Sequence, residues 1–108
     1  MLLYHYTDKD GYNAVRSQPA WMFKVSQPPK RENPVAAYFT ILNPQTPLLA
    51  VKLRIGRKKI EYAFEFENAG DLKRLDPDRE LGVFISKENY RVEPSRQKFH
   101  GPSEEWRG

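Results

Sequence analysis

The chain has 108 residues, of which 39% are apolar and 13% aromatic, so it can bury one hydrophobic core but not two independent ones. This aromatic content excludes a disordered chain, and no apolar run reaches the roughly 18 residues that a membrane-spanning helix needs. The absence of cysteine excludes disulfides, thiolate metal sites and a cysteine nucleophile. A net charge of +4 favours an anionic partner, which could be a nucleic acid, a dinucleotide or an acidic protein.

The first elements are predicted from short apolar runs and capping residues. Residues 2–6 are apolar and aromatic, which is typical of a buried strand. Thr7, followed three residues later by Asp10, supplies the capping chemistry for a helix of about two turns that ends before Pro19. Residues 20–23 form a second brief apolar run.

A proline-rich surface loop is predicted over residues 26–34, because three prolines exclude regular structure there. Residues 35–40 then form a buried strand. The segment 48–55 fits both a strand and a helix. We favour the helix, because Thr46 can act as its N-cap, Pro47 suits its first turn and Gly56 can end it.

The clearest periodicity lies in residues 60–67. One set of alternate residues is apolar, and the other set is mostly acidic and is predicted to face solvent; the sets are Ile60, Tyr62, Phe64 and Phe66, and Glu61, Ala63, Glu65 and Glu67. Further strands are predicted over residues 81–85 and 90–92. The core is then expected to span about residues 2–93, with residues 94–108 as a polar C-terminal extension of one domain that covers residues 1–108.

This order of elements mixes helices and strands without regular alternation, so the sequence predicts an α+β fold rather than a doubly wound sheet. Charge is also uneven along the chain. Five cations occur without an intervening acid, and seven acids follow them; the cations are Lys52, Arg54, Arg57, Lys58 and Lys59, and the acids Glu61, Glu65, Glu67, Asp71, Asp76, Asp78 and Glu80. Such runs are most often solvated faces.

His5 and Tyr38 are the first candidate site residues. Each alone is typical of a core position, where its polar atom finds a hydrogen-bond partner. Together they are more informative, because residues 3–7 read Leu-Tyr-His-Tyr-Thr and residues 38–40 read Tyr-Phe-Thr. A Lys-x-x-Tyr-x-x-Glu-like strand fits residues 59–66, and Gly-Val-Phe-Ile follows at residues 82–85.

In the order and spacing of these motifs, the chain resembles the bacterial toxin family known by its His-Tyr-Asp signature, within the His-Tyr-acid class of ADP-ribosyltransferases. The resemblance implies a split β-sheet core with one or two short helices and a cleft that binds NAD⁺. His5 would hydrogen-bond a ribose hydroxyl, and Tyr38 would stack on the nicotinamide ring. The Tyr6 backbone and the Thr7 hydroxyl would receive the carboxamide or a ribose. The other dinucleotide-binding candidates are Phe39, Thr40 and Trp21.

The resemblance also implies an acidic residue at the start of the strand at 81–85. Glu80 is the first choice and Asp78 the close alternative, with Asp76, Glu65 and Glu67 behind them. Such a carboxylate bonds the ribose 2′-hydroxyl and stabilises the positive centre that forms as nicotinamide leaves. No general acid is required, because nicotinamide departs as a neutral molecule.

Two departures from the family pattern stand out. Relatives often have glycine where Tyr6 follows the histidine, so the space beside the backbone is narrower here. Many relatives also carry a second ring-stacking aromatic on the helix after the tyrosine strand, and residues 46–49 supply none. Trp21 or Tyr90 could take that part.

The implied function is an NAD⁺-consuming toxin-type enzyme, either an ADP-ribosyltransferase with a macromolecular acceptor or an NAD⁺ glycohydrolase. The resemblance further implies a cytoplasmic site of action for the C-terminal domain of a delivered toxin, and an acidic immunity protein near residues 54–59. The alternative is a non-catalytic basic module of the same fold that binds RNA, ADP-ribose or a protein. An RNA 2′-phosphotransferase is a weaker alternative, since His100 lies outside the matched region. No metal site is expected, because the only histidines are His5 and His100.

Overall fold

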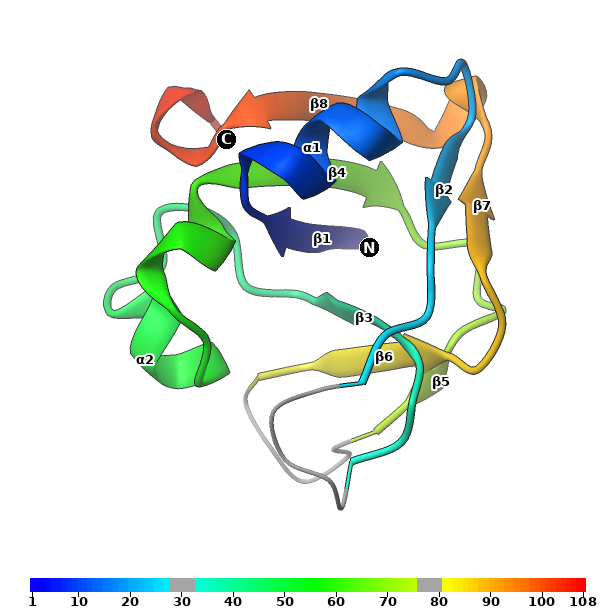
Figure 1. The fold of residues 1–108 in the computed structure, drawn as a ribbon, viewed down its shortest axis with the longest axis horizontal. Coiled ribbons are helices and arrows are strands. Elements are labelled where there is room, and N and C mark those ends of the chain that lie inside the picture. The colour runs from blue at the N-terminus through cyan, green and yellow to red at the C-terminus, as the bar shows by residue number, and fades with distance from the viewer. Residues whose placement is uncertain (28–32, 76–80) are drawn as a thin grey trace.

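The computed structural model describes residues 1–27, 33–75 and 81–108 and shows a mixed fold of strands and short helices (Figure 1). The strands are β1 (Leu2–Thr7), β2 (Trp21–Phe23), β3 (Ala37–Thr40), β4 (Tyr62–Glu67), β5 (Lys73–Arg74), β6 (Val83–Ser86), β7 (Tyr90–Val92) and β8 (Gln97–Pro102). The α-helices are α1 (Lys9–Arg16) and α2 (Leu49–Leu53), and the 3-10 helices are η1 (Arg57–Ile60), η2 (Pro94–Arg96) and η3 (Ser103–Glu105). The predicted α+β fold in a single compact domain is confirmed.

The strands form two antiparallel sheets. The larger sheet has the order β5-β6-β3-β1-β4-β8, and the smaller sheet pairs β2 with β7. Strands β1 and β4 share six residue pairs, whereas β1 and β3 are joined by the single pair Tyr4 and Thr40. The larger sheet is therefore split into two halves, β5-β6-β3 and β1-β4-β8, that meet at one point.

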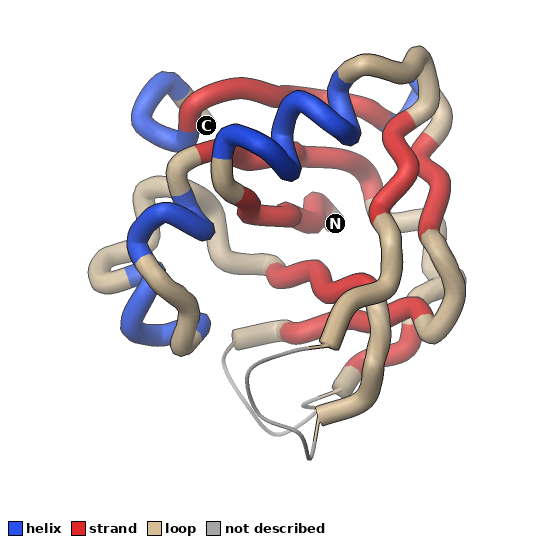
Figure 2. The backbone as a smooth tube through the Cα atoms, in the orientation of Figure 1, coloured by secondary structure: helices blue, strands red, loops and turns tan. Residues whose placement is uncertain are grey.

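An aromatic core fills the space between the two sheets. Phe64 and Phe66 of β4 are fully buried against Phe23 of β2 and Phe39 of β3. Helix α1 covers one end of this core, where Tyr12 stacks on Tyr62 at a ring distance of 4.5 Å. Figure 2 shows the helical segments at the periphery of the strands. The core is thus built mainly from rings that alternate along the strands.

Both predicted helices are present, with different boundaries. Helix α1 is capped by Asp8, whose Oδ1 accepts a hydrogen bond from the Gly11 N–H at 2.9 Å, because Thr7 is still the last residue of β1. Helix α2 begins after Leu48 rather than at Thr46, whose N–H donates to Asn43 O in a preceding turn. It ends at Leu53, with Arg54 rather than Gly56 following it as the C-cap.

The middle of the acidic side of β4 is buried in the structure, contrary to the prediction that this side faces solvent, whereas Glu61 is exposed and Glu67 is half-buried. Glu65 is only 8% exposed, and Ala63 beside it in the alternation is fully buried. The cover comes from Tyr4 of β1 and from Trp106, near the C-terminus. Strand β8 also pairs with β4 along most of its length. Residues 97–102 thus form an edge strand of the larger sheet, and Trp106 adds one buried side chain, although most of residues 94–108 are exposed or half-buried.

Among the residues that the structure describes, no helix is both long enough and apolar enough to cross a membrane.

Candidate functional site

His5 and Tyr38 meet at the junction of the two half-sheets. The His5 Nδ1–H donates to the carbonyl oxygen of Tyr38 at 3.0 Å. This bond lies next to the single pair between β1 and β3, where the strand ladder ends. No backbone N–H of β1 pairs with the Tyr38 carbonyl, so the His5 imidazole supplies the hydrogen-bond donor instead. The two residues predicted to share a site are brought together by the fold.

The surroundings of His5 keep its imidazole neutral. The rings of Phe23, Phe39 and Phe64 lie 4.7, 5.7 and 6.5 Å from the imidazole centre. Burial lowers the pKa of His5 below its ordinary value of 6.5, and the hydrogen bond to the Tyr38 carbonyl opposes this shift in part. Because Nδ1 carries the proton, Nε2 is an acceptor, and the described residues offer it no partner.

Thr7 lies two residues after His5 and so points to the same side of β1. Its hydroxyl has no hydrogen-bond partner in residues 1–27, 33–75 and 81–108. A Cβ added at Gly11 would lie 2.0 Å from the Thr7 Oγ1, so the glycine permits this close approach of helix α1. His5 Nε2 and Thr7 Oγ1 are therefore two open polar groups along one side of one strand.

Tyr38 is half-buried, and its hydroxyl is already used. The hydroxyl donates to the carbonyl oxygen of Pro34, which closes the start of β3 onto the preceding loop. Burial raises the pKa of Tyr38 above the ordinary tyrosine value, so the group remains a donor at neutral pH. The ring face is the part of Tyr38 that can still receive a planar ligand.

Several other residues predicted to bind the dinucleotide have side chains that are buried or already hydrogen-bonded within the fold. Phe39 and Trp21 are buried core residues, and so is Tyr90, whose hydroxyl donates to Asp71. Thr40 is 4% exposed, and its hydroxyl donates to Leu81 O and accepts from the Leu42 N–H. The side chains of these residues build the half-sheets rather than a dinucleotide site.

Tyr6 is also tied into the fold. Its hydroxyl donates to Leu42 O at 2.6 Å, and its ring stacks on Tyr4 at a centroid distance of 6.4 Å. Burial raises the pKa of Tyr6 far above the ordinary tyrosine value. The side chain thus packs against the chain after β3, on the side of β1 away from His5.

The leading candidates for the acid, Glu80, Asp78 and Asp76, lie outside the described residues. Of the remaining two, Glu65 is committed to a buried network. Its Oε2 accepts from the Tyr4 hydroxyl at 2.6 Å and from the Trp106 Nε1–H at 2.9 Å. This network fixes the C-terminal segment against the sheet.

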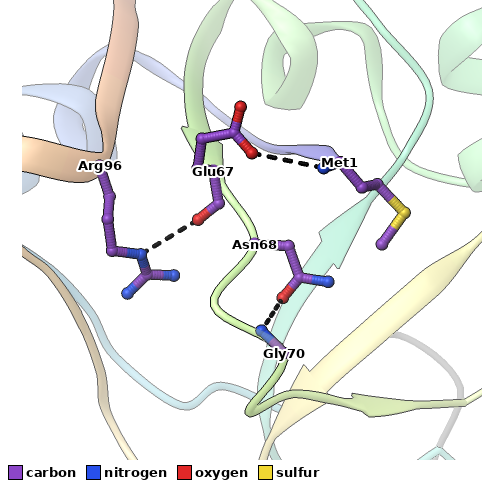
Figure 3. A network of polar contacts seen from close by, with 5 residues as sticks. All are labelled: Met1, Glu67, Asn68, Gly70 and Arg96. Atoms are coloured by element: carbon purple, nitrogen blue, oxygen red, sulfur yellow. Dashed lines mark hydrogen bonds and ion pairs between the residues drawn. The ribbon is translucent and has the colours of Figure 1, made fainter.

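Glu67 holds the start of the chain in place (Figure 3). Its carboxylate pairs with the N-terminal amino group at 3.3 Å, and its backbone oxygen accepts from the Arg96 Nε–H at 3.1 Å. The neighbouring Asn68 side chain accepts from the Gly70 N–H. Glu67 therefore has a structural role at the far end of β4 from His5.

Two shallow cavities in the described part of the chain have linings that do not include His5, Thr7 or Tyr38. One of about 380 Å³ is lined by Asp71, Lys73, Ile85, Ser86, Lys87 and Glu88. The other, of about 210 Å³, is lined by Gln18, Pro19, Ala20, Met22 and Arg91. The charged side chains of the first lie at the sheet edge.

No group of three or more histidine, aspartate or glutamate side chains in the described part of the chain could hold a metal ion. Gly11, which allows the contact between α1 and Thr7, is not among the site residues predicted from the sequence. A glycine inside a helix is unfavourable by about 1 kcal/mol relative to alanine, so its presence within residues 9–16 was the available signal.

The chain matches no known protein family, no curated protein and no solved structure.

Proposed function

We propose that this protein binds NAD⁺ at the junction of β1 and β3 and cleaves its nicotinamide-ribose bond. The observation that supports the proposal best is the hydrogen bond from His5 Nδ1–H to Tyr38 O at 3.0 Å. It joins the two residues that the sequence motifs single out, and it orients the imidazole with a free acceptor nitrogen.

In the proposed complex, His5 Nε2 accepts a hydrogen bond from a ribose hydroxyl, and the Thr7 hydroxyl bonds the second polar edge of the ligand. Tyr38 offers its ring face to the nicotinamide. These contacts hold the ribose in one orientation, which lowers the entropic part of the barrier. A carboxylate from residues 76–80, with Glu80 as first choice, would stabilise the positive charge that develops on the ribose.

The test is nicotinamide release from NAD⁺ by the purified chain and by His5→Asn. Asparagine can still donate to the Tyr38 carbonyl but has no atom equivalent to Nε2. We expect His5→Asn to stay folded and to lose at least about a hundredfold in kcat/KM, roughly 2.7 kcal/mol. A folded His5→Asn with wild-type turnover would contradict the assigned role.

Glu80→Gln and Asp78→Asn assign the acid in the same assay. The variant that removes the functional carboxylate should lose turnover and keep NAD⁺ affinity, because the carboxylate acts chiefly on the charge formed in the transition state. The other variant serves as its matched control. If neither variant lost turnover, the functional carboxylate would be assigned to Asp76.

The non-catalytic alternative is favoured by one observation, the exposed cations of α2 and η1. In that case the folded chain would bind an anionic ligand without releasing nicotinamide. If NAD⁺ is cleaved, the fate of the ADP-ribose separates the two enzyme types. A glycohydrolase releases it free, whereas a transferase attaches it to an added macromolecule.

A further inference from the structure

Strand β8 is an edge of the larger sheet, and one side of it pairs with β4. Figure 1 shows β8 at the border of the sheet, with the C-terminal segment at its end. The Ser103 N–H donates to Glu61 O at 2.8 Å, and this bond fixes the alternation of the ladder between β4 and β8. Phe99 and Gly101 direct their backbone groups to β4, whereas His100 directs its N–H and C=O outward. The middle of β8 therefore presents a donor and an acceptor that have no partner in the described part of the chain.

The two ends of β8 restrict how another strand can pair with its outer side. The ladder with β4 shifts by one residue at Lys98, which makes Lys98 the extra residue of a β-bulge. At the other end of the strand, Pro102 has no N–H to donate. Bulges, lysines and prolines protect sheet edges from unspecific pairing. In β8 they leave one short stretch centred on His100, so an added strand has to fit one register.

A second copy of β8 fits this register. In an antiparallel pair centred on His100, the two His100 residues exchange both backbone hydrogen bonds. Phe99 of each copy then faces Gly101 of the other, and the two phenylalanine rings flank the two-fold axis as diagonal neighbours. Phe99 is half-buried, so its ring still has apolar surface to bury. The His100 ring is held towards α1, because its Nδ1 is hydrogen-bonded to the Tyr12 hydroxyl at 2.8 Å.

The charges along this edge are complementary in the same register. Lys98 of one copy faces Pro102 of the other, and Pro102 leads directly into η3, which carries Glu104 and Glu105. These three charged side chains are exposed, and none of them forms an ion pair with another described residue. A two-fold axis repeats the arrangement, so opposite charges meet at both ends of the contact.

We propose that two copies of the chain associate by antiparallel pairing of their β8 strands, which joins the two larger sheets into one. A strand from another protein is less favoured, because the complementary groups all lie within β8 and η3. The contact is short, so association is weak and depends on protein concentration. This inference goes beyond NAD⁺ cleavage and does not depend on it, because β4 separates β8 from the strands that carry His5 and Tyr38.

Sedimentation velocity of the purified chain between about 5 and about 500 µM tests the proposal. We expect the weight-average mass to rise with concentration from that of the monomer towards twice that value. Lys98→Glu should raise the dissociation constant of the dimer about tenfold, because the new carboxylate faces Glu104 and Glu105 of the other copy. Combining it with Glu104→Lys and Glu105→Lys should restore association.

Lys73→Glu on β5 is the matched control, since it makes the same charge change at the opposite edge of the sheet. It should leave the dissociation constant unchanged. A monomer at every concentration would overturn the proposal. So would an equal effect of Lys98→Glu and Lys73→Glu, or reversed charges that fail to restore the dimer.

Single cysteines test the register, because the chain has no cysteine of its own. In the proposed pair the two His100 Cα atoms lie about 5.5 Å apart, which a disulfide can span. We expect His100→Cys to form a disulfide-linked dimer on mild oxidation at least about tenfold faster than Lys73→Cys at the other edge. Melting temperatures check that both variants are folded. Equal rates in two folded variants would overturn pairing through β8.

Discussion

The two sides of strand β1 differ in how their ionisable groups are hydrogen-bonded. On one side, His5 sits among phenylalanine rings with one hydrogen bond and an uncommitted Nε2. On the other side, Tyr4 meets Glu65, whose Oε2 accepts two hydrogen bonds in a network closed by Trp106. Both arrangements bury a polar group next to aromatic rings. Only the first leaves a polar atom available to a ligand, and the second stabilises the fold.

Trp106→Ala should produce the largest loss of stability. Trp106 is 7% exposed, packs edge-on against Tyr4 and donates to Glu65. We expect the free energy of unfolding to fall by about 3 to 5 kcal/mol, because the change leaves a cavity and removes one of the two hydrogen bonds to Glu65 Oε2. Urea denaturation measures this loss. Arg107→Ala, at the exposed neighbouring position, should change it by less than about 0.5 kcal/mol. If Trp106→Ala lost as little stability as Arg107→Ala, residues 103–108 would be shown to pack weakly against the sheet.

Glu65 offers a finer test of the closed network. Glu65→Leu removes the acceptor of both the Tyr4 hydroxyl and the Trp106 N–H, so we expect a loss of about 2 to 3 kcal/mol. Glu65→Gln should lose only about 1 kcal/mol, because the amide oxygen can accept both bonds. The two unfolding curves give the comparison. Equal losses would mean that the carboxylate charge, rather than the pair of hydrogen bonds, determines the effect.

His5 should make stability depend on pH. Burial holds its pKa in the folded chain below the ordinary 6.5, so the unfolded chain takes up a proton first as pH falls. The free energy of unfolding is therefore retained above pH 6.5 and decreases as pH falls from there towards the folded pKa. His5→Asn has no titrating group and should remove this part of the dependence. Unfolding at about pH 7.5 and about pH 5.5 measures the difference between the two proteins. Parallel pH dependence in both would contradict the assignment.

Tyr38→Phe should have the smallest effect. It removes the hydroxyl that donates to Pro34 O and keeps the ring. We expect a loss of about 0.5 to 1.5 kcal/mol in stability and nearly unchanged nicotinamide release. Tyr38→Ala also removes the ring face and should raise KM for NAD⁺. If Tyr38→Phe abolished turnover in a folded protein, the hydroxyl rather than the ring would face the ligand.

Local sequence patterns determined much of the fold. The apolar run at residues 2–6 and the alternation in residues 60–67 predicted β1 and β4, because a strand needs only a period of two and residues that suit a pleated surface. The helix preferred for the segment after Pro47 is present as α2. The spacing of His5 and Tyr38 identified a pair that the fold does bring into contact.

Tertiary contacts decided the rest. Alternation assigns Glu65 to one face of β4, but whether that face meets water depends on Trp106, which lies 41 residues away in the sequence. Strands β5 and β8 form by pairing with β6 and β4 rather than from a strong local preference. The boundaries of α2 follow from the buried Leu49 and the left-handed Leu48. The sequence by itself determined most of the strands and both α-helices, because those preferences are local. Which polar atoms stay open was decided only when distant segments packed together, because burial and hydrogen-bond partners are properties of the assembled chain.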